Sequence, residues 1–265
     1  MPEAPVTIIL LAGQRAGVVN PLAERAGVTH KCLVPIRGKP LIARVLDTVT
    51  GIPAVRCIRI SLEPEAHGDV ARLAEAFADR GVPVEFVANA RNIVDSVHIA
   101  AGSDAGPFLI TTADTVLLTR EGIAQVRERL KLHDGVLALA RKASVLAAHP
   151  EGQRGFYRFR DDEYANCNIY ALADRKALDI GAEIFRGGGQ FMKSVGRMIS
   201  AFGLHNIIAL RLGLFDREGA MRRLSKRLGV QLGATIFTDG ALAIDVDNER
   251  TYRVCEELLL RPRGG

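Results

Sequence analysis

Short runs of apolar residues alternate along the chain with segments in which apolar residues recur every three or four positions. Continuous runs indicate buried strands, and the three-to-four spacing indicates helices with one face against a core. In the first 140 residues this pattern predicts strands at 7–11, 55–62, 82–87, 108–112 and 135–140. It predicts helices at 40–49, 69–79, 93–101 and 120–132. Strands separated by helices are typical of a doubly wound, mostly parallel α/β sheet.

The rhythm changes after Gly155. Residues 156–159 and 164–171 alternate like antiparallel strands around a turn-like segment, which makes the predicted sheet mixed. The pattern then predicts helices at 176–185, 191–200, 205–214 and 217–228, strands at 230–237 and 241–246, and a closing helix at 249–260. No internal repeat interrupts the order. We therefore predict one domain, 1–265, with a helical insertion at about 174–228.

Composition limits the class of protein. A chain of 265 residues with 48% hydrophobic residues can bury an ample core. No apolar run approaches the roughly 18 residues that a membrane span needs, and the first residues lack the basic start of a signal peptide. The four cysteines lie far apart without a Cys-x-x-Cys spacing, which disfavours a zinc site and a disulfide framework. These features favour a cytoplasmic protein.

Positive charge is concentrated in one segment. The chain has a net charge of +5, and residues 186–227 contain nine basic and two acidic residues. Such an excess indicates an anionic partner, although arginine-rich helix faces are often only solvated. Leucines among the arginines also suit an amphipathic helix in peripheral contact with a membrane, or recognition of an anionic acceptor. Nucleic acid is disfavoured, because only 5% of the residues are aromatic. The oligomeric state cannot be read from the sequence.

The first forty residues contain the outline of a nucleotide site. The strand at 7–11 stops at Ala12-Gly13, and a long loop with Arg15, Arg25 and Lys31 follows. A small residue allows close approach of the backbone to a ligand, and loop N–H groups with basic side chains suit a polyphosphate. The segment Gly38-Lys39-Pro40 then begins the next helix.

Carboxylates follow two of the predicted strands. Asp114 comes directly after the strand at 108–112, and open α/β sheets place ligands at such strand ends. Asp245 and Asp247 end the strand at 241–246, and in an extended backbone they point to the same side. Mg²⁺ prefers one or two carboxylates together with water and phosphate oxygens. The alternatives are that Asp114 caps a helix or lies in a loop, and that Asp247 caps the last helix.

Amide and hydroxyl side chains mark two further candidate positions. The polar loop 89–96 contains Asn89, Asn92 and Ser96 and enters a helix, where it could read a base edge or simply cap the helix. Asn166 and Asn168 share one face of a predicted strand within an apolar run. Buried amides need partners, so a substrate and a backbone group are both possible partners of Asn168.

These segments together resemble the MobA-like nucleotidyltransferase family, whose fold is similar to that of the GT-A glycosyltransferases. The resemblance rests on Leu11-Ala12-Gly13 with 31–41, on Asp114, and on 244–247 before the final helix. It implies an enzyme that uses Mg²⁺ or Mn²⁺, held by Asp114 with Asp245 or Asp247. It implies that the nucleotide binds Leu11, Ala12, Gly13, Gln14, Lys31, Asn89, Asn92 and Ser96. Arg15 and Lys31 would neutralise phosphate charge, and Asn168 and Lys39 would meet the acceptor.

By this resemblance the reaction is transfer of NMP from an NTP, with CTP or GTP favoured, to a phosphorylated small molecule, with release of pyrophosphate. The chain departs from the family pattern in two segments. The second glycine of the first loop is displaced to Gly17, and Thr115-Val116 stands where a proline usually follows the aspartate. Two alternatives are glycosyl transfer from a nucleotide sugar, with Asp245 and Asp247 as the metal motif, and non-catalytic nucleotide binding at a membrane surface.

Overall fold

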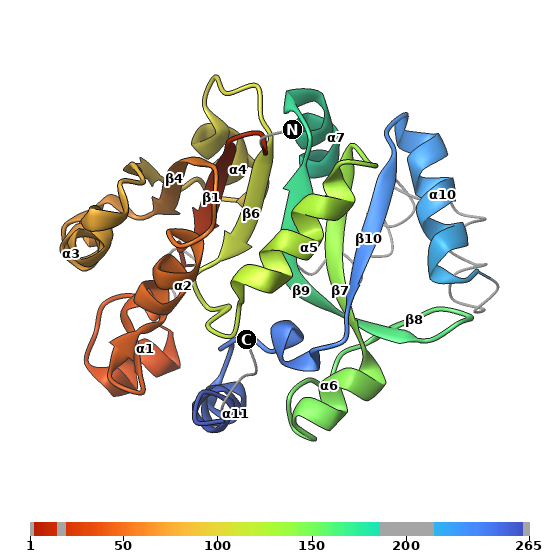
Figure 1. The fold of residues 1–265 in the computed structure, drawn as a ribbon. Coiled ribbons are helices and arrows are strands. Elements are labelled where there is room, and N and C mark those ends of the chain that lie inside the picture. Colours follow the sequence, from red (N-terminus) through yellow and green to blue (C-terminus); the bar gives the residue numbers. More distant parts are fainter. Residues whose placement is uncertain (1–2, 15–19, 186–214, 262–265) are drawn as a thin grey trace.

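A twisted mixed sheet forms the centre of the protein. The computed structural model describes residues 3–14, 20–185 and 215–261. Seven strands of the sheet lie in the order β10–β7–β9–β6–β1–β4–β5, and an eighth, β8, pairs with β9 (Figure 1). Their bounds are β1 Val6–Leu11, β4 Val55–Leu62, β5 Val84–Ala88, β6 Phe108–Thr112, β7 Gly135–Arg141, β8 Tyr157–Arg158, β9 Glu163–Leu172 and β10 Leu232–Phe237. A two-stranded hairpin, β2 Pro35–Ile36 and β3 Lys39–Pro40, stands apart.

Most neighbouring strands of the sheet are parallel. β6, β1, β4 and β5 run in one direction, and β10 runs parallel to β7. β9 lies between β6 and β7 and is antiparallel to both. The prediction of a doubly wound, mostly parallel and partly mixed sheet is therefore confirmed.

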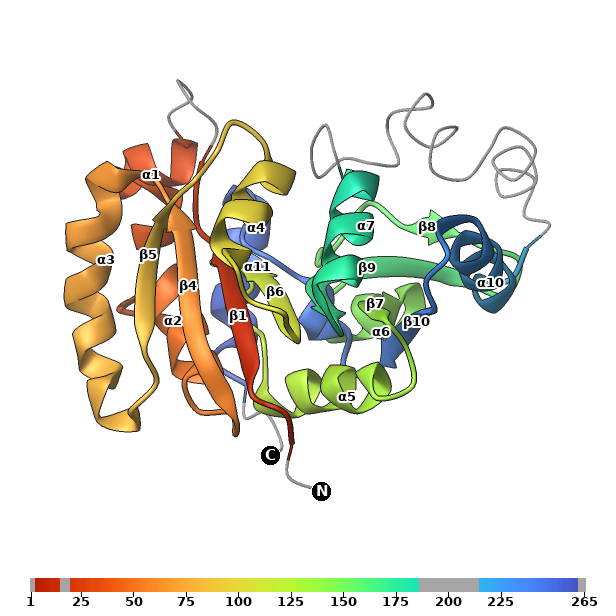
Figure 2. The same cartoon turned by 90° about the horizontal axis from the view of Figure 1, so that it is seen from above.

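Helices cover both faces of the sheet (Figure 2). Their bounds are α1 Pro21–Ala26, α2 Leu41–Val49, α3 His67–Ala74, α4 Ile93–Ala101, α5 Arg120–Leu130, α6 Lys142–Ala148, α7 Arg175–Phe185, α10 Arg217–Leu228 and α11 Glu249–Leu258. Successive side chains of β1 point to opposite faces of the sheet, which separates two cores. Ile8 and Leu10 pack on one face with α2 and α5. Ile9 packs on the other face with α4 and α7. None of the described helices is long and apolar enough to cross a bilayer.

The strand order reverses beside β1. From β1 the chain passes to β4 and β5 on one side, and β6 then returns to the other side of β1. A crevice outside the carboxyl ends of the strands at such a reversal is the usual ligand site of an open α/β sheet. The loop after Leu11 and the residue Asp114 both lie at this point, because they follow β1 and β6.

One predicted strand is wrong. The run at 241–246 forms the 3-10 turn η5, Gly240–Ala243, followed by irregular backbone. Its apolar side chains are buried because η5 packs tightly against α6: a Cβ at Gly240 would lie 2.2 Å from the Ser144 carbonyl oxygen. The sequence prediction also missed α1, α6 and the β2–β3 hairpin. The helices predicted at 191–200 and 205–214 lie outside the described residues.

Candidate active site

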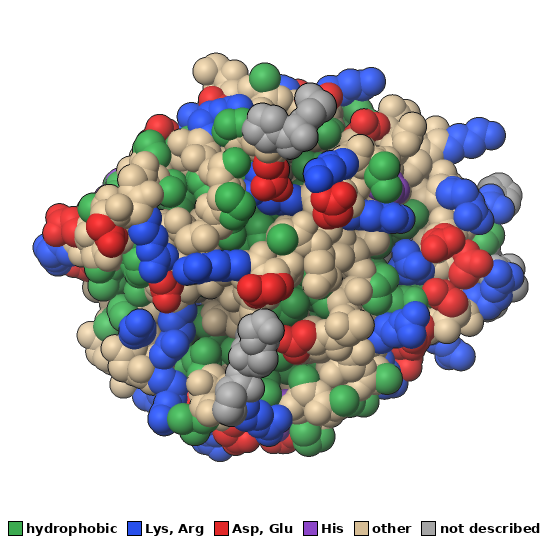
Figure 3. All heavy atoms as spheres, viewed as in Figure 1, with side chains coloured by type: hydrophobic (Ala, Val, Ile, Leu, Met, Phe, Trp, Pro, Cys, Tyr) green, Lys and Arg blue, Asp and Glu red, His purple; other side chains and the backbone are tan. Residues whose placement is uncertain are grey.

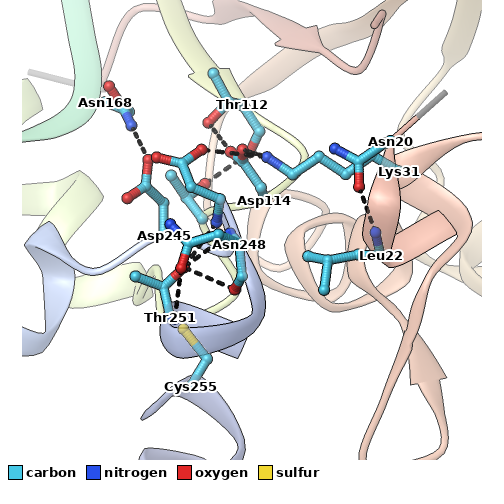
Figure 4. A network of polar contacts seen from close by, with 12 residues as sticks. Asn20, Leu22, Lys31, Thr112, Asp114, Asn168, Asp245, Asn248, Thr251 and Cys255 are labelled. Carbon is cyan, nitrogen blue, oxygen red and sulfur yellow. Dashed lines mark hydrogen bonds and ion pairs between the residues drawn. The ribbon is translucent and has the colours of Figure 1, made fainter. Parts of the chain in front are cut away.

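Three aspartates converge at the carboxyl ends of β1 and β6. Asp114 follows β6, and Asp245 and Asp247 lie between η5 and α11, about 130 residues further along the chain. One carboxylate oxygen from each residue lies within 4.8 Å of the other two. Figure 4 shows the carboxylates of Asp114 and Asp245 directed into the same space. The sequence-predicted carboxylates are thus brought together in one cluster.

Lys31 provides the cation of this cluster. It lies in the 3-10 turn η1, Lys31–Leu33, and its Nζ donates to Asp114 Oδ2 at 2.5 Å and to Asp247 Oδ1 at 3.3 Å. Burial by itself would lower the pKa of Lys31, but the carboxylates of Asp114 and Asp247 outweigh it and raise the pKa above the usual value. Lys31 therefore carries a positive charge at neutral pH.

Asp245 is the least solvated of the three carboxylates. Burial, followed by the negative charges of Asp114 and Asp247, raises its pKa to about 8. Three carboxylates so close together repel one another, and a single ammonium does not balance them. A hard divalent cation with oxygen ligands would relieve this repulsion, so the donor set fits Mg²⁺ or Mn²⁺.

The backbone around Asp245 and Asp247 explains why both carboxylates point into the site. Val246 N donates to the Asp114 carbonyl oxygen at 3.1 Å, and Asp247 N contacts the Asp245 carbonyl oxygen at 3.1 Å in a tight turn. Asn248, not Asp247, caps α11, through a capping box with Thr251. The carboxylate of Asp247 therefore contacts Lys31 and does not cap α11, so the helix-cap alternative for this residue is wrong.

Asp114 is likewise not a helix cap. The cap of α5 is Thr119, whose side chain accepts from Gly122 N. Asp114 Oδ1 instead accepts from the hydroxyl of Thr112 at 2.5 Å. Thr112 was not anticipated from the sequence, although its position two residues before a strand-end aspartate was visible there.

A β-bulge directs Asn168 toward the carboxylates. The register of β9 against β7 shifts between Leu137 and Leu139, and Asn168 has a φ of +53°. Asparagine is among the few residues that adopt this left-handed conformation readily. Its Nδ2 donates to Asp245 Oδ2 at 2.8 Å, and Gln153 Nε2, another residue not anticipated, donates to Asp245 Oδ1 at 3.3 Å. Bulges beside active sites commonly re-aim a side chain in this way.

The loop after β1 is held by groups at the end of β4. The N–H groups of Ala12 and Gly13 both donate to the Ser61 carbonyl oxygen, at 2.9 and 3.1 Å. Gln14 N donates to Glu63 Oε1 at 2.9 Å. These three N–H groups are therefore satisfied within the protein. The expectation that they contact phosphates stays a prediction, and Arg15 lies outside the described residues.

Glu63 also connects this loop to the Asn89 loop. Asn89 Nδ2 donates to Glu63 Oε1 at 2.8 Å, and a Cβ at Gly13 would lie only 2.5 Å from the same Nδ2. Only glycine allows Asn89 to pack this closely against the backbone. Glu63 was not anticipated from the sequence, although a carboxylate directly after a predicted strand was visible there.

Other predicted site residues have local roles in the structure. Asn92 caps α4 by accepting from Asp95 N, and Ser96 Oγ accepts from Ala90 N. These contacts match the capping alternative, and a role in base recognition stays untested. Lys39 is exposed in the β2–β3 hairpin, and no described hydrogen bond or ion pair joins it to the carboxylate cluster.

An open, mixed α/β sheet with a carboxylate–lysine cluster at its strand reversal has its charged groups where such folds bind ligands. The chain belongs to the MobA-like NTP transferase family, whose sequence model matches residues 8–182. The match includes Gly13, Lys31, Asp114 and Asn168 and ends before Asp245. The family predicted from the sequence is therefore confirmed.

Known proteins agree with this assignment. The chain is 26% identical over 228 residues to the bifunctional protein GlmU of Rhodopseudomonas palustris (strain BisB5), and the match covers 80% of the chain. It spans only about half, 48%, of that relative's length. Among solved structures, a hypothetical transferase from Thermus thermophilus has a TM-score of 0.73 and 24% identity, over 94% of this chain and 99% of that one.

Two more distant structures share the fold. The 4-diphosphocytidyl-2C-methyl-D-erythritol synthase of Anaerococcus prevotii DSM 20548 has a TM-score of 0.61 at 10% identity, over 98% of this chain and 100% of that one. A CMP:2-keto-3-deoxy-manno-octonic acid synthetase, solved with CTP, has a TM-score of 0.57 at 13% identity, over 97% and 98% of the chains. At these identities the likeness establishes the fold alone.

Proposed function

We propose that this protein is a nucleotidyltransferase, dependent on Mg²⁺ or Mn²⁺, that transfers NMP from an NTP to a phosphorylated small-molecule acceptor and releases pyrophosphate. The observation that carries the proposal is the cluster of Asp114, Asp245 and Asp247 around Lys31 at the strand reversal. Such a cluster suits phosphoryl transfer, which requires positioning and charge neutralisation more than a covalent nucleophile.

The proposed reaction is an in-line displacement at phosphorus. An ionised oxygen of the acceptor forms a bond to the α-phosphorus of the NTP, and the bond from that phosphorus to the bridging oxygen of the β-phosphate breaks. The electron pair leaves with pyrophosphate. A phosphate acceptor is already ionised near neutral pH, so no side chain has to remove a proton.

The residues of the cluster have different proposed roles. Asp114 would be one metal ligand and Asp245 or Asp247 the second, and a bound divalent ion would neutralise charge on phosphate oxygens. Thr112, Gln153 and Asn168 hold these carboxylates in place through hydrogen bonds. Lys31 contacts the carboxylates now and would turn to the phosphates when a nucleotide is present.

The family resemblance favours CTP or GTP, and two proteins of similar fold support CTP. The 2-keto-3-deoxy-manno-octonic acid synthetase of similar fold was solved with CTP. The name of the other protein of similar fold, a 4-diphosphocytidyl-2C-methyl-D-erythritol synthase, contains a cytidyl group. Asn89 is a candidate for contact with the base, because it packs directly on Gly13. Asn168 and Lys39 remain the candidates for contact with the acceptor.

The positive charge of segment 186–227 supports an anionic acceptor, and peripheral contact with a membrane stays a prediction from the sequence. Of this segment the structure describes the part that contains α10, with Arg222, Arg223 and Lys226. On the face drawn in Figure 3, acidic and basic side chains are interspersed, and several basic ones project at the edge where α10 lies in Figure 1.

Thermal unfolding with nucleotides tests the proposal. The protein would be heated with CTP, GTP, UTP or ATP, each with and without MgCl₂, beside the Asp114→Asn variant. A ligand that binds only the folded state raises the melting temperature. We expect a Mg²⁺-dependent rise with one nucleotide that the variant loses. No rise with any nucleotide would overturn the proposal. Release of nucleoside diphosphate in place of pyrophosphate would indicate glycosyl transfer.

A further inference from the structure

An apolar cavity of about 260 Å³ lies beside the carboxylate cluster, on the face of the sheet that carries α7 and α10. β6, β7 and β9 form its floor, with Ile110, Leu137 and Leu139 among the lining residues. α7 and α10 form its walls, and Figure 2 shows both helices on this same side of the sheet. The mechanism proposed above uses none of these apolar side chains.

The cavity adjoins the proposed active site through two residues that contact both. Thr112 and Asn168 both line the cavity. Thr112 donates to Asp114 at 2.5 Å, and Asn168 donates to Asp245 at 2.8 Å. A molecule in the cavity would therefore contact the two side chains that bond to the carboxylates expected to hold the metal.

Three of the polar residues that line the cavity, Asn166, Asn168 and Tyr170, lie close together on β9 and bond to one another. Asn166 Nδ2 donates to Asn168 Oδ1 at 3.0 Å and to the hydroxyl of Tyr170 at 2.5 Å. Apart from these groups and from Thr111, Thr112 and Tyr157, the wall offers hydrocarbon, for example from Val97, Leu178 and Leu224. The cavity is thus polar where Asn168 bonds to Asp245 and mostly apolar elsewhere.

The sequence of α10 is amphipathic, with an apolar face toward the cavity and basic residues outside it. Ala220, Met221 and Leu224 line the cavity, whereas Arg222 and Lys226 belong to a separate basic hollow outside it. These apolar residues recur among arginines because they form the face of α10 that lines the cavity. From the sequence alone, a solvated helix and a helix at a membrane surface were both open interpretations of this pattern.

We infer that the acceptor is an amphiphile: a phosphate or phosphonate monoester whose head reaches the carboxylate cluster and whose hydrocarbon chain occupies this cavity. The inference rests on the proposed function, because it gives the substrate class of the same site. It excludes acceptors that are polar throughout, since these would leave the hydrocarbon wall without a partner.

Binding of two alkyl phosphates tests the inference. Decyl phosphate and ethyl phosphate would be titrated into the full chain by calorimetry, below the concentration at which decyl phosphate forms micelles. Each buried methylene strengthens binding by about fourfold at most. We expect decyl phosphate to bind at least about tenfold more tightly. Equal affinities would overturn the inference.

A substitution on α7 shows whether the chain enters this cavity. Gly181 lines the cavity, and a Cβ there meets only the Leu172 side chain, at an ordinary 3.5 Å. Gly181→Leu should fill the cavity without strain and favour the helix. Gly68→Leu, on the exposed face of α3 with nothing within 4 Å of its Cβ, is the matched control.

We expect Gly181→Leu to weaken decyl phosphate binding by about tenfold and to leave ethyl phosphate unaffected, with Gly68→Leu behaving as wild type. Unchanged decyl phosphate binding by Gly181→Leu would overturn the inference. Nucleotide thermal shifts on the same proteins separate the two proposals. Nucleotide binding with equal alkyl phosphate affinities contradicts only the amphiphile, and chain-length selection without nucleotide binding contradicts only the transferase.

Discussion

Lys31 and Asp114 form an ion pair across the site, with Nζ 2.5 Å from Oδ2, although 83 residues separate them in the chain. Both side chains are largely buried, at 19% and 18% exposure. Because Lys31 occupies the space between carboxylates that a divalent cation would neutralise, lysine and metal would be alternative partners of the same oxygens. The apo-protein is therefore stabilised by its own cation.

This relationship predicts opposite effects of Lys31→Met on metal binding and on catalysis. Removing the ammonium removes a competitor, so Mn²⁺ should bind the nucleotide-free variant more tightly, by about tenfold, since one lost charge contact is worth roughly 1.4 kcal/mol. Transfer should fall by at least about a hundredfold, because charge on the phosphates loses its partner. Calorimetric titration with Mn²⁺ and a pyrophosphate-release assay measure the two effects.

Lys39→Met is the control for this prediction, since Lys39 is an exposed lysine eight positions away. Its Mn²⁺ affinity should equal that of the wild type. If Lys31→Met binds Mn²⁺ more weakly, Lys31 supports the metal site and does not compete with it.

Asp114→Asn and Asp245→Asn should each reduce transfer by roughly a thousandfold or more. An amide cannot supply the negative oxygen that a hard divalent cation prefers, and the change leaves side-chain volume almost the same. Circular dichroism should show an intact fold. Asp69→Asn, a surface aspartate of α3 paired with Arg72, is the matched control and should retain full activity. Full activity of Asp114→Asn would disprove its role as a metal ligand.

The raised pKa of Asp245 predicts how stability depends on pH. Its pKa is about 8 in the folded protein and about 4 in an unfolded chain, so the folded state binds this proton more tightly. The resulting stabilisation is complete below about pH 4 and is lost as the pH rises through about 8. In EDTA, the melting temperature of the wild type should therefore fall relative to that of Asp245→Asn between pH 6 and pH 9.

Mg²⁺ should reverse this trend, because the metal binds the ionised carboxylate. The rise in melting temperature that saturating Mg²⁺ gives the wild type should grow over the same pH range, and Asp245→Asn should show little of it. Parallel pH curves for the two proteins in EDTA would show that the proton on Asp245 has no influence on stability.

The sequence predicted the sheet and most of the cluster because both follow from local pattern. Buried parallel strands are continuous apolar runs, and a polar residue at the end of such a run lies at the carboxyl edge of the sheet. Asp114 fits this rule directly. Asp245 and Asp247 were placed in the site for a partly wrong reason, since their backbone is a tight turn and not a strand. Apolar runs alone do not distinguish a strand from other buried backbone.

The remaining parts of the site depend on contacts between distant segments. The bulge at Asn168 arises from the register of β9 on β7, which no local pattern of β9 encodes. Likewise, Gln153 reaches Asp245 across 92 residues. The apolar cavity requires α7 and α10 to pack on one face of the sheet, so its existence could not be predicted from either helix alone.

Glu63 should determine nucleotide affinity more than the rate of the chemical step. Its Oε1 accepts from Gln14 N and from Asn89 Nδ2, and so it fixes the loop after β1 against the Asn89 loop. Glu63→Ala leaves both donors without this partner and should raise KM for the NTP by about tenfold, with kcat changed by less than about threefold. Glu65→Ala, an exposed carboxylate two residues further on, should leave both constants unchanged. A fall in kcat with an unaltered KM would instead put Glu63 among the groups that act on the reacting phosphate.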